Sequence, residues 1–202
     1  MTIVVLGASG RAGKEIVAEL VARGNTVLGI ARKPEAIATL PGVTALPGDA
    51  ADPAALAGLI TGAQAVISAL HFDIPAQTLL SALRQAGVTR LLVVGGAGSL
   101  EVAPGVRLID TPEFPAAWKA AAQGGVDFLD DLRGVDDIDW TFFSPASFIF
   151  EGPRLGHFRL GKDELVTDEN GESKISFADY AIALVDELEQ GRHIKARFTA
   201  AY

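Results

Sequence analysis

The sequence predicts an α/β protein built on a doubly wound, mainly parallel sheet with helices on both faces. Short aliphatic or β-branched runs alternate with helical patterns, which is the sequence form of repeated strand–helix–strand units. Most of these runs are continuously apolar, as expected of strands covered on both faces. The 202 residues, 49% of them apolar, are enough to bury the core that such a sheet needs.

Six strands are expected at the short apolar runs, and a seventh near the C-terminus. They are Thr2–Leu6, Thr26–Ala31, Val43–Leu46, Ala65–Leu70, Arg90–Val94, Trp140–Ser144 and Lys195–Ala200. The helices between them have recognisable ends, such as the N-cap Asp52 before Pro53 and the terminal glycines Gly24 and Gly87. The expected helices are Arg11–Arg23, Ala54–Ile60, Pro75–Ala86 and Pro115–Arg133.

After Ser144 the pattern changes, and we expect a small C-terminal extension with a hairpin and a helix. Asn170-Gly171, between the extended segments Glu164–Thr167 and Ser173–Ser176, is a strong hairpin signal. Ser176 followed by Asp179 predicts a capping box that opens a helix to about residue 189. No linker interrupts the chain. We therefore expect one domain over residues 1–202, in which residues 145–202 form a substrate-cleft extension.

Composition and charge exclude several classes of protein. The absence of cysteine excludes disulfide scaffolds, thiolate zinc sites and cysteine nucleophiles, and the net charge of -8 argues against a general nucleic-acid binder. Residues Pro53–Phe72 contain no Asp, Glu, Lys or Arg, but they divide into a helical half and a strand-like half, which argues against a membrane span. No signal peptide is expected, so we predict a cytoplasmic protein with neither a membrane nor a nucleic acid as partner.

A glycine-rich loop follows the first strand and opens the first helix. Its glycines permit a tight turn and a close approach of the backbone to a pyrophosphate. The free N–H groups at the start of the helix also favour binding of the negatively charged pyrophosphate. A buried-type strand before it and an amphipathic helix after it indicate a nucleotide site rather than an ordinary turn. The sequence therefore predicts a Rossmann-type fold whose cofactor contacts include Gly7, Ala8, Ser9, Gly10, Arg11, Ala12 and Gly13.

The G-x-x-G-x-x-G spacing of this loop is characteristic of the short-chain dehydrogenase/reductase superfamily, which the chain resembles. The usual acid of that superfamily is a Tyr with a Lys four residues later. Neither tyrosine fits, because Leu184 follows Tyr180 at that spacing and Tyr202 is the last residue. Trp118-Lys119 stands where that Tyr would lie, so we do not expect carbonyl or alcohol chemistry through the standard residues.

Three further segments resemble an atypical branch of the superfamily, the NAD(P)H-flavin reductase family, which is related to biliverdin-IXβ/flavin reductases and NmrA-like proteins. These segments are Leu91–Leu100, Asp139–Ala146 and Gly171–Ala181. The resemblance covers essentially the whole chain. It implies a protein that takes hydride from NAD(P)H and passes it to a flavin, bound as a substrate rather than as a tightly held group.

The end of the second strand indicates which dinucleotide is bound. Arg32 and Lys33 stand where an acidic residue would hydrogen-bond the ribose of NAD. Two cations at this place suit the 2′-phosphate of NADP(H), and Arg11 in the glycine-rich loop is expected nearby. We therefore favour NADP(H) over NAD(H). The alternative is that Arg32 and Lys33 form a solvated loop.

Further cofactor contacts are expected at the carboxyl ends of the other strands, where ligands of doubly wound sheets lie. These residues are Asp49 and Ala50 after the third strand, Ser68, Ala69 and Leu70 at the fourth, Gly95 and Gly96 after the fifth, and Pro145 and Ala146 after the sixth. Asp49 is suited to accept a hydrogen bond from the adenine amino group, and its alternative role is to cap the turn that follows.

Two residues at the same edge of the sheet, Ser99 and His71, are catalytic candidates because either can supply a proton, and Lys119 lies further away. For each of them a structural or solvated role is the alternative. Four phenylalanines (Phe72, Phe148, Phe150 and Phe158) either line a cleft for a flat acceptor or pack in the core. The three histidines are too dispersed to form a metal site, and the acidic residues from 127 to 139 lack the spacing of a calcium loop.

These observations predict an NAD(P)H-dependent oxidoreductase that prefers NADPH and passes hydride to a flavin or another small flat acceptor. A second hypothesis, from another class, is a catalytically silent NmrA-like sensor that binds NADP(H) and regulates a partner. A third is an epimerase-like or quinone-reducing enzyme on the same fold.

Overall fold

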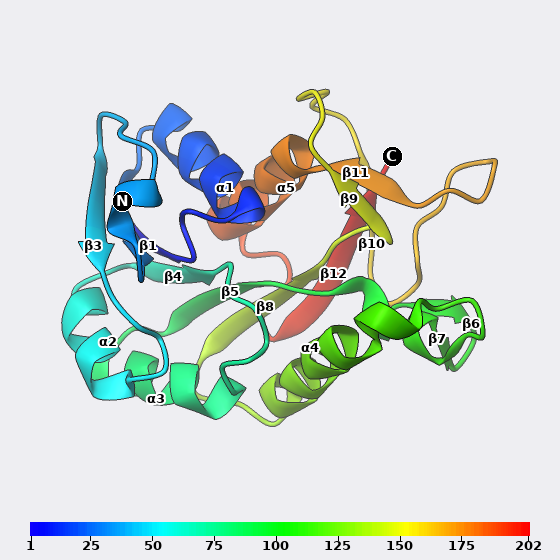
Figure 1. Ribbon diagram of the computed structural model, residues 1–202, viewed down its shortest axis with the longest axis horizontal. Coiled ribbons are helices and arrows are strands. Elements are labelled where there is room, and N and C mark those ends of the chain that lie inside the picture. Colours follow the sequence, from blue (N-terminus) through cyan, green and yellow to red (C-terminus); the bar gives the residue numbers. More distant parts are fainter.

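The computed structural model describes all 202 residues and contains one eight-stranded sheet (Figure 1). Its strands are β1 (Thr2–Leu6), β2 (Thr26–Ala31), β3 (Val43–Pro47), β4 (Ala65–Ser68), β5 (Arg90–Val94), β8 (Asp139–Ser144), β10 (Arg159–Gly161) and β12 (Ala196–Ala201). Their spatial order is β3-β2-β1-β4-β5-β8-β12-β10, and all neighbours are parallel except β10 and β12. The predicted doubly wound, mainly parallel sheet is confirmed.

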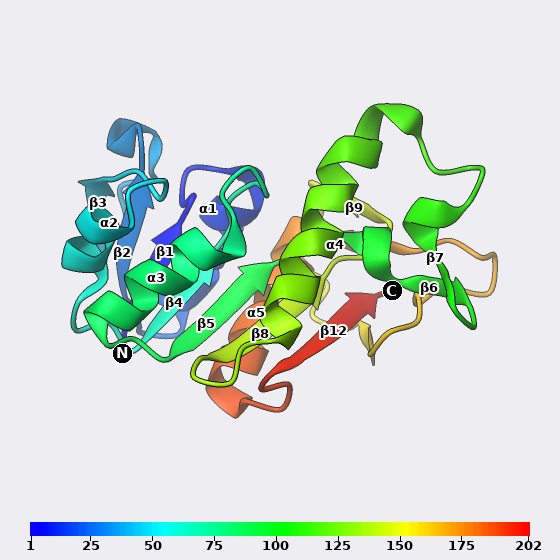
Figure 2. The ribbon, with the colours of Figure 1, turned by 90° about the horizontal axis from the view of Figure 1, so that it is seen from below.

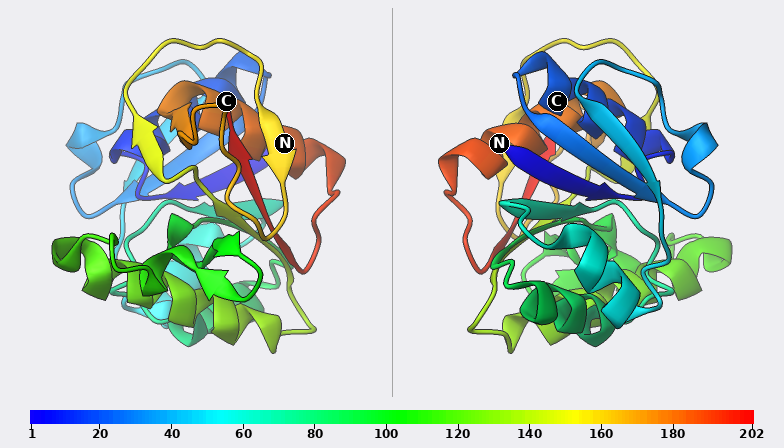
Figure 3. Two further views of the ribbon diagram at one scale, coloured as in Figure 1. Left: turned by 90° about the vertical axis from the view of Figure 1, so that its right-hand side faces the viewer. Right: turned by 90° about the vertical axis from the view of Figure 1, so that its left-hand side faces the viewer.

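Five α-helices cover both faces of this sheet. They are α1 (Arg11–Ala22), α2 (Pro53–Ile60), α3 (Ala76–Ala86), α4 (Lys119–Arg133) and α5 (Phe177–Gln190). α1 and α5 pack together on one face, and α2, α3 and α4 lie on the other (Figures 2 and 3). The buried apolar residues accordingly form two layers, one on each side of the sheet. No helix has the length and apolar composition that crossing a bilayer requires.

The position of each strand explains how clearly it shows in the sequence. Every residue of β4 is buried, as are four of the five residues of β1, because these strands lie in the middle of the sheet. β3 lies at the edge and exposes Thr44, Ala45 and Pro47, so its apolar pattern is weaker. β10 is short, exposed and antiparallel, and no pattern in the sequence predicted it.

The predicted helix ends are largely confirmed. The carboxylate of Asp52 accepts hydrogen bonds from the first two free N–H groups of α2 at 3.1 and 3.0 Å. Gly87 ends α3 with a φ of 69°, a left-handed conformation that costs glycine little. Ser176 Oγ accepts from the N–H of Asp179 at 3.0 Å, but the return bond of a capping box is missing, because the N–H of Ser176 donates to the hydroxyl of Tyr202.

α4 continues through two glycines that weaken its sequence pattern. A Cβ on Gly124 would lie 3.1 Å from the Cβ of Phe72, and one on Gly125 would lie 3.0 Å from its Cε2. The ring of Phe72 also packs against two other buried phenylalanines. The glycines therefore form a notch that receives Phe72, which belongs to the core rather than to an open cleft. The helical pattern before α4 is a single 3-10 turn, Ala116–Trp118.

The predicted C-terminal hairpin is wrong in its pairing, although its turn is present. Asp168 accepts hydrogen bonds from the N–H groups of Asn170 and Glu172, both at 2.9 Å. The segment after the turn, β11 (Lys174–Ser176), pairs in parallel with β9 (Phe148–Phe150).

The segment before that turn is held elsewhere, which prevents the hairpin. The N–H of Leu165 donates to the carbonyl oxygen of Glu101 at 2.8 Å. Glu101 begins a separate small hairpin, β6 (Glu101–Ala103) with β7 (Val106–Arg107), which the sequence did not predict.

Candidate functional site

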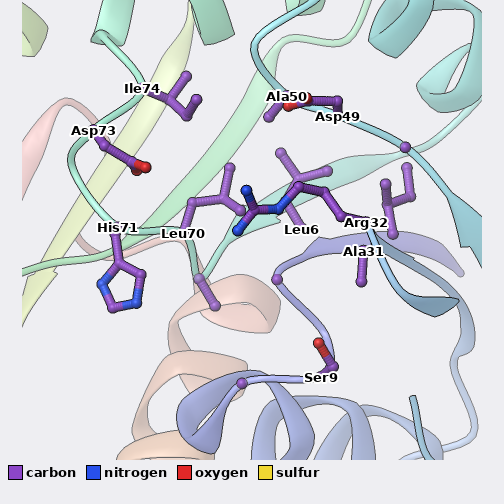
Figure 4. Close-up of a pocket in the computed structure, with 15 residues that line it drawn as sticks. Leu6, Ser9, Ala31, Arg32, Asp49, Ala50, Leu70, His71, Asp73 and Ile74 are labelled. Carbon is purple, nitrogen blue, oxygen red and sulfur yellow. The ribbon is translucent and has the colours of Figure 1, made fainter. Parts of the chain in front are cut away.

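A pocket of about 230 Å³ opens at the carboxyl ends of β1, β2, β3 and β4 (Figure 4). This is the edge of the sheet at which the strand order reverses, the usual ligand position in doubly wound proteins. The pocket is lined by Leu6, Gly7, Ser9, Gly10, Ile30, Ala31, Arg32, Gly48, Asp49, Ala50, Ala69, Leu70, His71, Asp73 and Ile74.

The glycines of the loop after β1 meet two different requirements. Gly7 has a φ of 73°, and a Cβ on it would lie 2.6 Å from the carbonyl oxygen of Ala69. A Cβ on Gly13 would lie 2.2 Å from the carbonyl oxygen of Gly7, so the packing of α1 on the loop excludes a side chain. A Cβ on Gly10 would meet only that carbonyl oxygen, at 3.3 Å. Gly10 is therefore less constrained than Gly7 and Gly13, and its exposed backbone is free to be approached by a ligand.

The start of α1 lies beside this open backbone. Gly10 is the N-cap of the helix, and no side chain caps its first N–H groups. These groups carry the partial positive charge of the helix dipole and remain available to an anion. Gly10 and Ser9 are both exposed and both line the pocket. The loop can therefore hold a phosphate group as the sequence predicts.

Of the three cations predicted near the ribose, one lines the pocket. Arg32 is exposed at the end of β2, and its side chain reaches into the pocket in Figure 4. Lys33 does not line the pocket and is the N-cap of a short 3-10 turn. The guanidinium of Arg11 lies over the ring of Phe177 on α5, 5.4 Å from its centroid. Arg32 is thus the cation placed to meet a phosphate here.

Asp49 and Ala50 line the pocket as expected, and Asp49 also has a local role. Its Oδ1 accepts a hydrogen bond from the N–H of Ala51 at 3.0 Å, which closes a tight turn after β3. Capping of α2 belongs to Asp52 instead. Asp49 therefore fixes a turn and also lines the pocket, and its hydrogen bond to an adenine amino group stays a prediction.

At the end of β4, Ala69, Leu70 and His71 line the pocket, whereas Ser68 is buried and does not. His71 is exposed, in contrast to the second catalytic candidate, Ser99. The structure does not bring Ser99 into this pocket.

Ser99 is held by Arg197, a buried side chain that also pairs with the exposed Asp163. Its Oγ accepts a hydrogen bond from Arg197 Nη1 at 3.0 Å, and Arg197 Nε donates to Asp163 Oδ1 at 2.9 Å. Because the oxygen of Ser99 is used as an acceptor, its own hydroxyl hydrogen is left to donate to another group.

The remaining predicted contacts do not line the pocket. These are Ala8, Ala12, Gly13, Gly95, Gly96, Pro145 and Ala146. The space beside Gly95 is filled by the ring of Phe142, whose Cε1 would lie 2.3 Å from a Cβ on that glycine. Gly95 and Gly96 follow β5, and Pro145 and Ala146 follow β8, at the same edge of the sheet as the pocket. Their contact with the nicotinamide stays a prediction.

Six lining residues were not predicted. Leu6, Ile30 and Ala31 are the last residues of β1 and β2, so the rule that ligands lie at strand ends could have found them. Gly48, Asp73 and Ile74 lie in the loops after β3 and β4, where no motif marks them.

Neither tyrosine is placed to act as an acid in the pocket. Tyr180 is completely buried, and this burial raises the pKa of its hydroxyl well above the ordinary value. Tyr202 donates its hydroxyl hydrogen to Asp179 Oδ2 at 2.6 Å. Burial and then this hydrogen bond raise the pKa of Tyr202. Both phenols therefore bind their hydrogens firmly at neutral pH.

Two acidic residues of α4 and the loop after it form ion pairs. Asp130 pairs with Arg133, and Asp137 pairs with Arg84. The bond from Arg84 lowers the pKa of Asp137 to about 2. No group of three or more histidine, aspartate or glutamate side chains is arranged to hold a metal ion.

The chain is similar to known proteins over nearly its whole length. YwnB of Bacillus subtilis (strain 168), an uncharacterized protein, is 42% identical and is matched over 98% of this chain and 97% of its own. A solved structure from Bacteroides thetaiotaomicron, whose name proposes an epimerase, is 39% identical with a TM-score of 0.95, covering 100% of this chain and 96% of that one. A structure from Streptococcus pneumoniae TIGR4, whose name proposes an NADH-flavin reductase, is 37% identical with a TM-score of 0.85, covering 100% and 99%.

A family model described as NAD(P)H-binding matches residues 7–190. The match begins at Gly7, the first residue of the glycine loop, and contains every predicted cofactor contact. It confirms the family resemblance drawn from the sequence. The chain belongs to this family of NAD(P)H-binding proteins.

Proposed function

We propose that the protein is an NAD(P)H-dependent oxidoreductase that prefers NADPH and reduces a small flat acceptor, such as a flavin, that it binds only for turnover. The observation that carries the nucleotide preference is Arg32. This cation reaches into the pocket from the end of β2, where an acidic residue would instead favour the free ribose hydroxyls of NADH.

The glycine loop and Arg32 divide the binding of the nucleotide between them. The backbone of Gly10 and the start of α1 hold the pyrophosphate, and Arg32 holds the 2′-phosphate by a charge-assisted hydrogen bond. Asp49 accepts from the adenine amino group through the oxygen that its turn leaves free. These contacts fix the adenosine half and direct the nicotinamide toward the ends of β5 and β8.

The absence of a proton-donating tyrosine supports a flavin or a similar acceptor. The bound nicotinamide supplies a hydride that a flavin ring can take directly when the two rings stack. The protein then contributes mainly alignment of the two rings and exclusion of competing acceptors. Where a proton is needed, His71 and the free hydroxyl hydrogen of Ser99 are the candidates at this edge of the sheet.

A catalytically silent NADP(H) sensor is the second candidate function, because both phenols donate their hydrogens to other groups of the protein. The two candidates share the pocket and differ in turnover. The relatives whose names propose an epimerase and an NADH-flavin reductase are named as enzymes, although for different reactions.

Steady-state oxidation of NADPH with FMN, riboflavin and small quinones tests the proposal. We expect turnover with at least one acceptor and a higher rate with NADPH than with NADH. Calorimetric titration with NADP⁺ on the same preparation provides the control for binding. Micromolar NADP⁺ affinity without turnover for any acceptor would exclude the reductase and favour the sensor.

A further inference from the structure

Asp73 brings a carboxylate into the nucleotide pocket from the side opposite Arg32. It lies in the loop between β4 and α3, and Figure 4 shows its side chain directed into the same space that the guanidinium of Arg32 enters from β2. Both side chains are exposed. Neither makes a hydrogen bond or an ion pair within the protein. The pocket therefore contains an uncommitted cation and an uncommitted anion that face each other.

Local structure does not account for this carboxylate. Asp73 precedes α3 but does not cap it, because the N-cap is Pro75 and no side chain accepts from the first N–H groups. Asp49, the other carboxylate of the pocket, differs in this respect because it closes the turn after β3. Asp73 thus has no partner in the fold and is free to act on whatever enters the pocket.

A carboxylate in this position acts against a phosphate. The 2′-phosphate carries close to two negative charges at neutral pH, whereas the free ribose hydroxyl of NAD(H) carries none and can donate a hydrogen bond. Arg32 attracts the phosphate, and Asp73 repels it across the same small pocket.

We propose that Asp73 is a specificity-determining residue that opposes the 2′-phosphate, so that the pocket accepts both NADP(H) and NAD(H) with a smaller preference than Arg32 alone would set. This inference rests on the proposed nucleotide site, but it does not depend on turnover and holds equally for a reductase and a sensor.

Asp73→Asn is the variant that tests it, because it removes the charge and keeps the shape of the side chain. We expect NADP⁺ to bind about three- to tenfold more tightly relative to NAD⁺, a modest change because solvent screens exposed charges. Isothermal titration of both nucleotides gives the ratio. Glu169→Gln removes the same charge from an exposed turn of the C-terminal extension and should leave the ratio unchanged.

Salt concentration separates this electrostatic role from a structural one. The difference between Asp73→Asn and the wild type should shrink in 1 M salt, where the screening length falls to about 3 Å. Thermal melting of both proteins checks that folding is unchanged, and Asp73→Ser provides a second charge-free variant.

Two results would overturn the proposal, and a third would refute the site on which it rests. An unchanged NADP⁺ to NAD⁺ ratio in both Asp73 variants would remove it while leaving the nucleotide site intact. If both variants bind NADP⁺ and NAD⁺ more weakly by the same factor, Asp73 contacts the nucleotide without determining specificity. Failure of the wild type to bind either nucleotide would instead refute the proposed function itself.

Discussion

The hydroxyl of Tyr180 donates a hydrogen bond of 2.7 Å to the carbonyl oxygen of Phe143, and the two rings stack with their centroids 4.0 Å apart. Tyr180 lies on α5 and Phe143 on β8, so the contact joins the C-terminal helix to the middle of the sheet. Tyr180 is therefore a part of the core and is not an acid of the pocket.

Tyr180→Phe should therefore reduce stability and leave NADPH oxidation intact. The carbonyl of Phe143 also accepts from the N–H of Gly95 at 2.8 Å, so it is not orphaned when the hydroxyl is removed. We expect the free energy of unfolding to fall by about 1–2 kcal/mol, the lower part of the range for a lost buried hydrogen bond. Urea unfolding at pH 7 measures the loss. A large drop in turnover with unchanged stability would contradict this assignment.

Tyr180 should also make the stability of the protein fall at alkaline pH. Its folded pKa is raised above the unfolded value of about 10, so above that pH the folded protein binds more protons than the unfolded chain. The stabilisation is complete below pH 10 and is lost as the pH rises toward the folded pKa. Between pH 9 and 11 the wild type should lose stability more steeply than Tyr180→Phe, whereas Tyr202 contributes equally to both. Equal slopes would refute this linkage.

Gly13→Ala and Gly10→Ala should have different effects. A Cβ on Gly13 would lie 2.2 Å from the Gly7 carbonyl oxygen, and we expect a loss of about 1–3 kcal/mol in the free energy of unfolding, as in other overpacked sites. Gly10→Ala should change stability by less than about 0.5 kcal/mol, since its Cβ would meet only one atom at 3.3 Å. It should nevertheless weaken NADP⁺ binding about tenfold by standing where the pyrophosphate approaches. Calorimetric titration and thermal melting separate the two effects, and normal NADP⁺ binding by Gly10→Ala would place the pyrophosphate elsewhere.

Arg32→Ala should weaken the binding of NADPH more than the binding of NADH. We expect the difference between the two binding free energies to change by about 1–3 kcal/mol. Lys33→Ala is the matched control, because it removes a neighbouring charge that does not line the pocket. Titration of each variant with both nucleotides measures the effect. An equal loss for the two nucleotides in Arg32→Ala would show that this residue does not meet the 2′-phosphate.

Glu187→Gln should destabilise the protein without changing its nucleotide affinity. Glu187 is 1% exposed, accepts from the backbone N–H of His193 at 2.8 Å and lies 3.6 Å from Arg90 Nη2. Removing its charge leaves the largely buried guanidinium with only the weaker attraction of Asp139, and we expect a loss of about 2–4 kcal/mol, below the range for a closely bonded buried pair. Arg90 begins β5, at the opposite edge of the sheet from the pocket, so NADP⁺ should bind normally to the folded variant. Denaturant unfolding and titration together check both statements, and weaker NADP⁺ binding would reveal coupling between the two edges.

The central fold could be predicted from the sequence because its signals are local. The apolar runs of β1, β2, β4, β5 and β8, the cap at Asp52 and the turn at Gly87 each depend on residues close together in the chain. The glycine loop belongs to the same class, because its spacing, the strand before it and the helix after it can be read directly.

Contacts between distant segments could not be predicted in this way. The turn expected at Asn170-Gly171 is present, but the segments on its two sides do not pair with each other. The segment before it bonds to Glu101, more than sixty residues earlier, and the segment after it pairs with β9. The hydroxyl of Ser99 accepts a hydrogen bond from Arg197, which lies close to the C-terminus.

The sequence by itself determined that a dinucleotide-binding sheet forms and where its glycine loop lies. Only the tertiary structure decided which charges line the pocket, because that depends on the direction of each side chain and on loops that meet only after folding. Arg32 and Lys33 are neighbours with the same charge, yet Arg32 alone lines the pocket. Asp73, which no motif marks, reaches the same pocket from a loop that lies forty residues further along the chain.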